Sequence, residues 1–157
     1  MGTRASQLLL LLACGAGCGF GAEQPVPLYD AGNRLGPDQV ATLGGYLAHV
    51  DGRDVSALGG AFEVLPGCHV VTTPTNWGSM STTSGVSAST GAVTFAVPMV
   101  AGHHYAIISV SEQSGAPTFR VRVRMDETNA SGDFVRSFDP VKTSAELDAC
   151  RQPPPAA

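Results

Sequence analysis

The sequence has few charged residues and no excess of positive charge. Charged side chains make up 14% of the 157 residues, and the formal net charge is -4. Nucleic-acid binding depends on basic residues that neutralise backbone phosphates, and strong attraction to an anionic membrane surface depends on a similar basic field. The composition therefore disfavours nucleic acid as a partner.

The sequence also lacks the short motifs that mark common catalytic sites. It contains no G-x-S-x-G, S-x-x-K or H-E-x-x-H motif and no glycine-rich phosphate loop. The close ligand spacings of many metal sites, such as H-x-H, H-x-x-x-H and C-x-x-C, are absent from residues 25–150. We therefore expect a protein that is not an enzyme and that carries no cofactor.

The apolar run near the N-terminus is too short to span a membrane. It extends from Leu8 to Ala13, whereas a spanning helix needs about 20 apolar residues. It follows a single positive charge at Arg4 and precedes small residues, which is typical of a signal peptide. We predict that residues 1–13 direct secretion and are then removed.

The end of this run resembles a bacterial lipobox, with the residues Leu11-Leu12-Ala13-Cys14. The resemblance implies that the Cys14 thiol is acylated and that Cys14 becomes the first residue of the mature chain. Gly15, in place of the aspartate associated with inner-membrane retention, implies sorting to the outer membrane. We expect the protein to face the periplasm there, with exposure at the cell surface as the alternative. Residues 14–24 would then form a flexible tether. Acylation of Cys18 and cleavage without lipid are the alternatives.

Cys68 and Cys150 are the two cysteines within the region that is expected to fold. Secreted proteins meet oxidising conditions, in which such a pair is normally joined. We therefore predict a Cys68–Cys150 disulfide, and closing so long a loop contributes on the order of 4 kcal/mol of stability. An oxidised Cys68 also argues against a role with His69 as a nucleophile and its base.

The remaining pattern predicts short strands separated by turns. Apolar and polar residues alternate over residues 92–99 and 118–126, which is typical of half-buried strands. Residues 104–110 are almost wholly apolar, which predicts an interior strand covered on both faces. Residues 133–139 predict a last strand. Residues 39–50 predict two short strands or one strand bent at its glycines.

Two turns are expected to organise these strands. Within residues 61–73, Pro66 fixes φ for the second position of a turn, and Gly67 tolerates the positive φ that a type II turn needs next. The two halves of this stretch are therefore expected to pair as a central hairpin. Asp51-Gly52 predicts a second, tight hairpin.

The C-terminal region predicts one helix. Thr143-Ser144-Ala145-Glu146 has the pattern of a capping box, and the helix that follows would carry Cys150. The proline-rich residues 151–157 are expected to be a disordered tail. The predicted fold is therefore all-β: a single small antiparallel β-sandwich over residues 25–150 with a short C-terminal helix, preceded by the signal peptide and the tether.

Five short motifs resemble the small PEGA-like domains of bacterial envelope proteins and lipoproteins, whose function is unassigned. They are spread over a stretch of about 65 residues and are Ala41-Thr42-Leu43, Val50-Asp51-Gly52, Leu65-Pro66-Gly67-Cys68-His69, Val93-Thr94-Phe95 and Ala101-Gly102-His103-His104-Tyr105. The motifs are turn chemistry, which transfers fold better than function. The resemblance implies a transthyretin-like β-sandwich that acts as an accessory or interaction module.

Histidines supply the residues for an alternative function. His69, His103 and Met99 would suit copper or zinc by ligand type. His103 and His104 are adjacent, so on a strand they point to opposite faces and at most one of them joins a given site. The alternative is a small periplasmic metal- or ligand-binding protein that uses the loop of residues 74–91 and these histidines.

Three arginines form a candidate interaction face. Arg120, Arg122 and Arg124 alternate along one predicted strand, so their side chains would project from one face about 7 Å apart. This row either contacts an acidic partner or is a solvated face that discourages strand-to-strand aggregation. The function we expect is a lipid-anchored envelope lipoprotein that acts as a non-enzymatic structural or protein-interaction module. Its partner is an unknown envelope protein or polymer.

Overall fold

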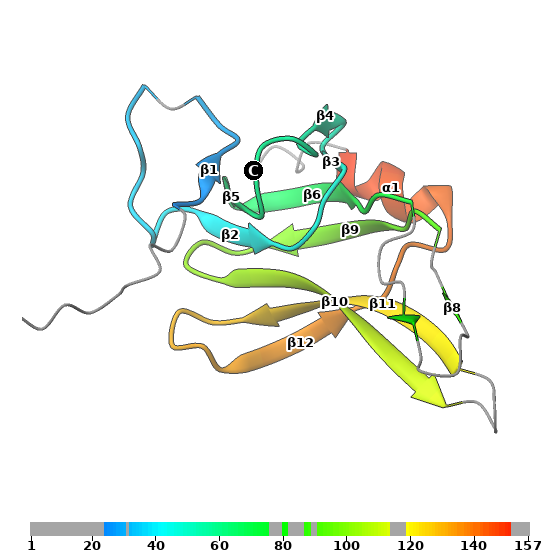
Figure 1. Ribbon diagram of the computed structural model, residues 1–157. Helices are drawn as coiled ribbons and strands as arrows, with labels where there is room; N and C mark the ends of the chain where they lie inside the picture. Colours follow the sequence, from blue (N-terminus) through cyan, green and yellow to red (C-terminus); the bar gives the residue numbers. More distant parts are fainter. Residues whose placement is uncertain are drawn as a thin grey trace, which may run out of the picture.

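The computed structural model describes residues 24–30, 32–75, 80–81, 87–88, 91–113 and 119–151, without the side chains of residues 80–81, 87–88, 111–113 and 119–120. The predicted signal peptide, nearly all of the tether, most of the 74–91 loop and nearly all of the C-terminal tail lie outside these residues. Within them the chain forms strands of two to ten residues and one short helix (Figure 1). The expectation of an all-β fold is therefore confirmed.

The larger sheet contains six strands in the order β1-β5-β2-β10-β11-β12. Their bounds are β1 Val26–Pro27, β2 Ala41–Gly44, β5 Ala61–Val64, β10 His104–Gln113, β11 Phe119–Thr128 and β12 Phe134–Phe138. β1 runs parallel to β5, and β2 runs parallel to β10, so the prediction of an entirely antiparallel fold is wrong. Neither parallel pair joins strands that are consecutive in the chain, so neither has to be connected by a tight turn.

The second sheet has four strands in the order β4-β3-β6-β9, and all its pairs are antiparallel. Their bounds are β3 His49–Val50, β4 Arg53–Asp54, β6 Gly67–Thr72 and β9 Thr94–Met99. Two further strands, β7 (Met80–Ser81) and β8 (Ser87–Ala88), pair with one another. β2 and β3 belong to different sheets, so residues 39–50 form two strands rather than one bent strand.

The tight hairpin predicted at Asp51-Gly52 is confirmed by the pairing of β3 with β4. Asp51 has a φ of 51° and Gly52 a φ of 81°. Positive φ at both central residues is the signature of a type I′ turn, whose twist matches the flanking strands. Aspartate tolerates this left-handed conformation better than most side chains, and here it places the Asp51 carboxylate beside β6.

The central hairpin predicted within residues 61–73 is not formed. β5 pairs with β1 and β2, whereas β6 pairs with β3 and β9. Leu65 and Pro66 carry the chain from one sheet to the other, and Gly67, with a φ of 148°, begins β6. A type II turn would need a φ of about 80° at this glycine. The crossing lets each strand find two partners in its own sheet, while Pro66, which has no N–H, lies outside both ladders.

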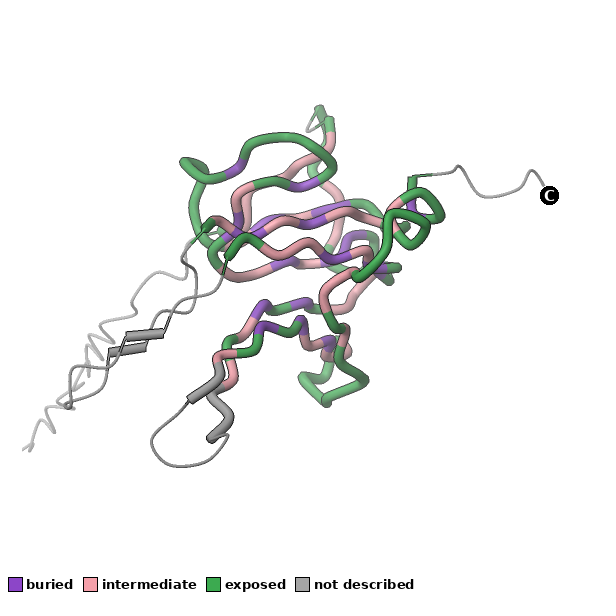
Figure 2. The backbone as a smooth tube through the Cα atoms, turned by 90° about the vertical axis from the view of Figure 1, so that its right-hand side faces the viewer, coloured by how far each residue is buried: buried purple, intermediate pink, exposed green. Residues whose placement is uncertain are grey.

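Inward-facing side chains of both sheets meet in one hydrophobic core. Figure 2 shows buried positions alternating with more exposed ones along the strands. The predicted alternation is confirmed in β9 and in the described part of β11, whose buried residues are Phe95, Val97, Met99, Val123 and Met125. The core is completed from both sheets by Leu43, Val50, Phe62, Val64, Val71, Tyr105 and Ile107, together with Leu47 and Val55 from connecting segments.

β10 lies inside the larger sheet, between β2 and β11, but only one of its faces is covered. Tyr105 and Ile107 are buried, whereas Ala106 on the other face is exposed. Ile108 is half-buried and lies opposite Arg124 of β11. The prediction of a strand covered on both faces is therefore wrong. The outer apolar residues of β10 face solvent beside long arginine side chains, whose stems are themselves apolar.

The helix α1 (Ser144–Arg151) packs against β6 and β9. Cys150 is joined to Cys68 of β6 with their Cα atoms 5.2 Å apart, which is the predicted pair. The Glu146 carboxylate accepts the Lys142 N–H at 3.0 Å, one residue earlier than the capping box predicts. Cys150 is the buried residue of α1. The disulfide is therefore a principal attachment of this helix to the sheet.

Candidate functional site

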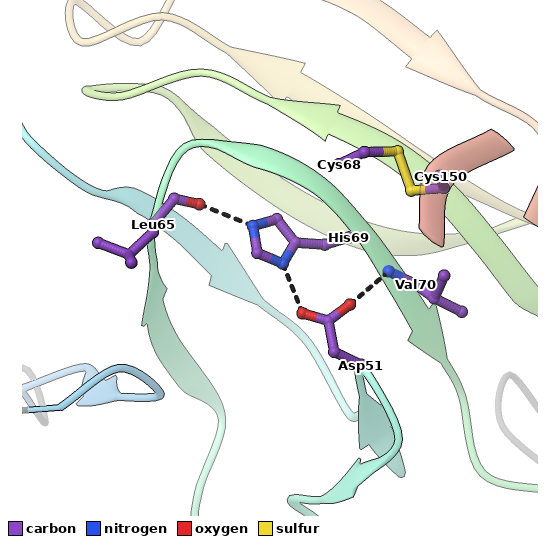
Figure 3. The surroundings of a disulfide bond; sticks show 6 residues. All are labelled: Asp51, Leu65, Cys68, His69, Val70 and Cys150. Carbon is purple, nitrogen blue, oxygen red and sulfur yellow. Dashed lines mark hydrogen bonds and ion pairs between the residues drawn. A yellow bond between two sulfur atoms is a disulfide. The ribbon is translucent and has the colours of Figure 1, made fainter. Parts of the chain in front are cut away.

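Two polar clusters lie where the sequence places candidate residues. The first, the His69 cluster, consists of His69, Asp51 and the carbonyl of Leu65. The His69 ring nitrogens lie 2.6 Å from Asp51 Oδ2 and 2.7 Å from the Leu65 oxygen (Figure 3). The second oxygen of Asp51 accepts the Val70 N–H at 2.8 Å. The cluster thus joins the β3–β4 turn, the β5–β6 crossing and β6.

The two side chains of this cluster shift one another's pKa. Burial lowers the pKa of His69, but the hydrogen bonds to Asp51 and to the Leu65 carbonyl, with the charge of Asp51, outweigh burial and raise it above its ordinary value. Burial raises the pKa of Asp51, but the hydrogen bonds involving His69 and the Val70 N–H outweigh burial and hold it below its ordinary value. The geometry therefore favours an imidazolium beside a carboxylate.

The His69 cluster lies next to the disulfide. Cys68 immediately precedes His69 in β6, yet its sulfur points to Cys150 of α1 while the imidazole points to Asp51 (Figure 3). Neighbouring residues on a strand project to opposite faces. In this disulfide, Cys68 has no thiol to ionise, and His69 is directed away from it. The pair is therefore not arranged as a nucleophile and its base.

The second cluster, the Glu127 cluster, consists of Glu127, His103, Tyr105 and Arg136. Glu127 is only 1% exposed, and its Oε1 lies 2.7 Å from His103 Nδ1 and accepts the Tyr105 hydroxyl at 2.9 Å. Its Oε2 accepts Arg136 Nε at 2.6 Å. A buried carboxylate is tolerated only with such partners, because desolvation otherwise strongly disfavours its charge.

The same contacts set the pKa values of the Glu127 cluster. Burial raises the pKa of the Glu127 carboxyl, but the hydrogen bonds from Arg136, His103 and Tyr105 outweigh burial and hold the pKa below its ordinary value. Burial, aided by the neighbouring carboxylate, raises the pKa of Tyr105 to about 12. Glu127 is therefore a charged group at the edge of the core that joins β10, β11 and β12.

The Tyr105 hydroxyl also connects the Glu127 cluster to the turn between β9 and β10. It accepts the Val100 N–H at 2.9 Å while it donates to Glu127. His103, in the same turn, borders a surface hollow of about 620 Å³ that His104 also lines. Most of the contacts in this cluster bind one element of the fold to another. We therefore assign the cluster a structural role.

The candidate metal ligands are not brought together. His69 binds Asp51, His103 binds Glu127, and Met99 is buried opposite Gly67 in the second sheet. Across the residues that the structure describes, no group of three or more histidine, cysteine, aspartate or glutamate residues is arranged to hold a metal ion. The loop of residues 74–91, the other half of the alternative, lies largely outside the described residues.

The predicted arginine row is present in part. Arg122 and Arg124 are exposed on the outward face of β11, whereas the side chain of Arg120 lies outside the described residues. Arg124 forms an ion pair with Asp126 at 2.9 Å, and Arg122 lies 3.9 Å from Asp139. Exposed pairs of this kind are weak. The neighbouring aspartates nonetheless reduce the positive charge that this face offers to an acidic partner.

β12 presents the most exposed large apolar side chain described. Phe134 is 63% exposed and Val135 is 45% exposed. β12 is the last strand of the larger sheet, so its outer backbone edge has no partner strand among the described residues. A register shift between Glu127 and Thr128 of β11 brings Phe134 opposite Thr128. This bulge accompanies the exposure of two successive apolar residues.

Sequence reasoning missed the two carboxylates that organise these clusters. Asp51 was expected only as a turn residue, and the partnership with His69 joins residues 18 positions apart. The buried position of Glu127 could have been predicted from the sequence. It continues the inward-facing alternation of Val123 and Met125, and a charged residue at an inward position of a strand needs buried partners.

Comparisons of the chain with protein-family models, with curated proteins and with solved structures found no match. In the part of the chain that the structure describes, no helix has the length and apolar character needed to cross a membrane. The function of this chain is therefore inferred from its own residues and geometry.

Proposed function

We propose that this chain is a bacterial envelope lipoprotein, acylated at Cys14 and held at the outer membrane by the tether of residues 14–24. Its two sheets form a β-sandwich that acts as a non-enzymatic protein-interaction module. The Cys68–Cys150 disulfide supports a location outside the reducing cytoplasm. The lipobox-like residues before Cys14 support the lipid anchor.

The observation that carries the interaction module is the outer edge of β12, which no other described strand covers. Edge strands of soluble proteins are usually guarded by charged side chains, proline or a covering segment. The one cation of β12, Arg136, instead binds the buried Glu127 and lies over the ring of Phe138. The exposed Phe134 and Val135 beside it make this part of the edge apolar.

The partner that fits this edge is an extended strand of another envelope protein. A strand added to a sheet edge gains backbone hydrogen bonds along its length, and its alternate side chains contact the exposed residues of the edge. Asp133 and Asp139 flank β12 and are both exposed. The complementary strand would therefore be apolar opposite Phe134 and Val135, with basic residues where it passes Asp133 and Asp139.

The lipid anchor is tested by intact mass spectrometry of the membrane-extracted protein, with and without reduction. We expect a chain that begins at Cys14 with added acyl groups and that gains two hydrogens from its disulfide on reduction. A chain that begins beyond residue 18 without lipid would contradict the anchor.

The interaction edge is tested by placing a photo-crosslinking amino acid at Val135 in the native bacterium. We expect a covalent adduct with one defined envelope protein, with its crosslinked peptide identified by mass spectrometry as an extended apolar segment. Leu58, which is 37% exposed near β1 at the opposite edge of the sheet, is the matched control position and should give no such adduct. Absence of an adduct at Val135, or an adduct only with a second copy of this chain, would contradict the proposal.

A further inference from the structure

The His69 cluster has an unusual balance of hydrogen-bond donors and acceptors. A neutral imidazole carries one N–H donor and one acceptor nitrogen. Here both ring nitrogens face oxygen atoms, Asp51 Oδ2 at 2.6 Å and the Leu65 carbonyl oxygen at 2.7 Å. A carbonyl oxygen only accepts hydrogen bonds, so the nitrogen that faces Leu65 must carry a proton.

The Asp51 side also requires a proton on the ring. The other Asp51 oxygen accepts the Val70 N–H, and the two hydrogen bonds favour the ionised carboxylate. An ionised carboxylate has no proton to donate. His69 must therefore donate from both nitrogens at once, and only the imidazolium form can do so.

We propose that His69, Asp51 and the Leu65 carbonyl form a pH-sensitive clasp that holds the β5–β6 crossing against the β3–β4 turn. When His69 loses a proton, the remaining ring proton stays with Asp51, because a carboxylate is the stronger acceptor. Nε2 then presents a lone pair to the Leu65 oxygen. The two acceptors repel one another, and the crossing at Leu65-Pro66 separates from His69.

Other ionisable groups around the clasp also affect its charge. Tyr29 and Arg53 line the same hollow as His69, and Arg151 of α1 lines an adjacent hollow with Asp51. The two arginines are cations that oppose protonation of His69, whereas the direct contact with Asp51 favours it. The side chain of His69 is only 14% exposed. Because Asp51 contacts the ring directly at 2.6 Å, it outweighs the arginines.

Release of the clasp would change a specific part of the surface. Leu65 is 46% exposed, and with His69 it lines a hollow of about 280 Å³ that also includes Leu28, Tyr29 and Val50. Movement of Leu65 away from His69 widens this hollow. The proposed device therefore couples pH to the shape of the surface between the two sheets.

The clasp is tested by NMR titration of the secreted, disulfide-bonded protein, with detection of the His69 ring nitrogens and the Leu65 carbonyl carbon. We expect protons on both ring nitrogens at low pH and loss of one proton with a midpoint above the ordinary histidine value of about 6.5. The Leu65 carbonyl shift should change with the same midpoint. The Leu65 and Gly67 amides should then show increased motion in ¹⁵N relaxation.

Two variants test whether the change at Leu65 depends on the contact between His69 and Asp51. Asp51→Asn keeps the size of the side chain but removes the charge, so the midpoint of His69 should fall and the Leu65 response should move with it. His49→Gln removes an exposed imidazole from β3, outside the clasp, and should leave the Leu65 response unchanged. A His69 midpoint at or below about 6.5, or a Leu65 carbonyl that does not follow His69, would overturn the proposal.

Discussion

The His69 and Glu127 clusters both contain a histidine beside a carboxylate, with closest N–O distances of 2.6 Å and 2.7 Å. Their surroundings differ. The Asp51 side chain is 49% exposed and the Glu127 side chain is 1% exposed. His69 faces a second acceptor, whereas Glu127 also receives a second and a third donor, from Tyr105 and Arg136.

This comparison shows that the other partners of a histidine–carboxylate pair decide its role. A second acceptor on the ring makes the His69 cluster depend on a proton that is exchanged near neutral pH. Additional donors on the carboxylate make the Glu127 cluster a permanent ion pair within the fold. The disulfide adds a further difference, because it lies beside the His69 cluster, whereas the Glu127 cluster is held by hydrogen bonds and packing.

The largest expected effect is loss of the disulfide beside the His69 cluster. The double variant Cys68→Ser/Cys150→Ser should lower the free energy of unfolding by about 4 kcal/mol, because the unfolded chain regains a long unclosed loop. Helix α1, whose buried residue is Cys150, should detach. Urea unfolding measures the first change and amide exchange in residues 144–151 measures the second. Unchanged protection of these amides would show that packing alone holds the helix.

The second-largest expected decrease in stability follows from disrupting the Glu127 cluster. Glu127→Leu should lower the free energy of unfolding by about 3 kcal/mol, because the buried Tyr105 hydroxyl and the His103 and Arg136 donors all lose their acceptor. Glu63→Leu is the matched control. Glu63 accepts hydrogen bonds from the exposed Arg34 and from the Tyr29 hydroxyl near the surface, so its loss should cost less, about 1 kcal/mol. The two free energies are measured by urea unfolding. Equal decreases for Glu127→Leu and Glu63→Leu would show that burial does not make Glu127 the more important carboxylate.

The smallest effect concerns the pH dependence of stability. The pKa of His69 is raised in the folded protein. Its contribution to the free energy of unfolding is therefore complete below the unfolded-state pKa of about 6.5 and is lost as pH rises through the folded-state pKa. The pKa of Asp51 is lowered in the folded protein. Its contribution to the free energy of unfolding is therefore present above the unfolded-state pKa of about 3.9 and is lost as pH falls through the folded-state pKa. Asp51→Asn should flatten both slopes and lower neutral-pH stability by about 1 kcal/mol, since Asp51 is half exposed.

Urea midpoints measured from pH 3 to pH 9 check this prediction, with His49→Gln as the control. The control variant should keep both slopes of the wild-type protein. Wild-type stability that rises between pH 7 and pH 9 would have the wrong sign for the His69 cluster.

Local patterns in the sequence predicted the strands more successfully than their partners. Alternation in residues 92–99 and 118–126 placed Phe95 and Met125 correctly inside, because the two-residue period of a strand is a local property. The Pro66-Gly67 turn was misassigned because a crossing between two sheets and a hairpin use the same residue types. The choice between them depends on which distant strands pair, and local sequence does not record that choice.

The disulfide and the two polar clusters also differ in how far the sequence alone predicts them. The pairing of Cys68 with Cys150 could be expected because the region had two cysteines and an oxidising compartment was indicated. The His69 cluster could not be expected, since its partners come from a turn 18 residues away and from a backbone carbonyl. Glu127 could have been found from its inward position, but its partners depend on the order of β10, β11 and β12.

The central claim, that His69 is held between two acceptors as an imidazolium, is tested most directly by neutron diffraction from a deuterated crystal grown at a pH of about 6. The account predicts deuterium on both Nδ1 and Nε2 of His69, with the latter directed at the Leu65 carbonyl oxygen. Deuterium on only one ring nitrogen, or a ring turned away from Leu65, would contradict it.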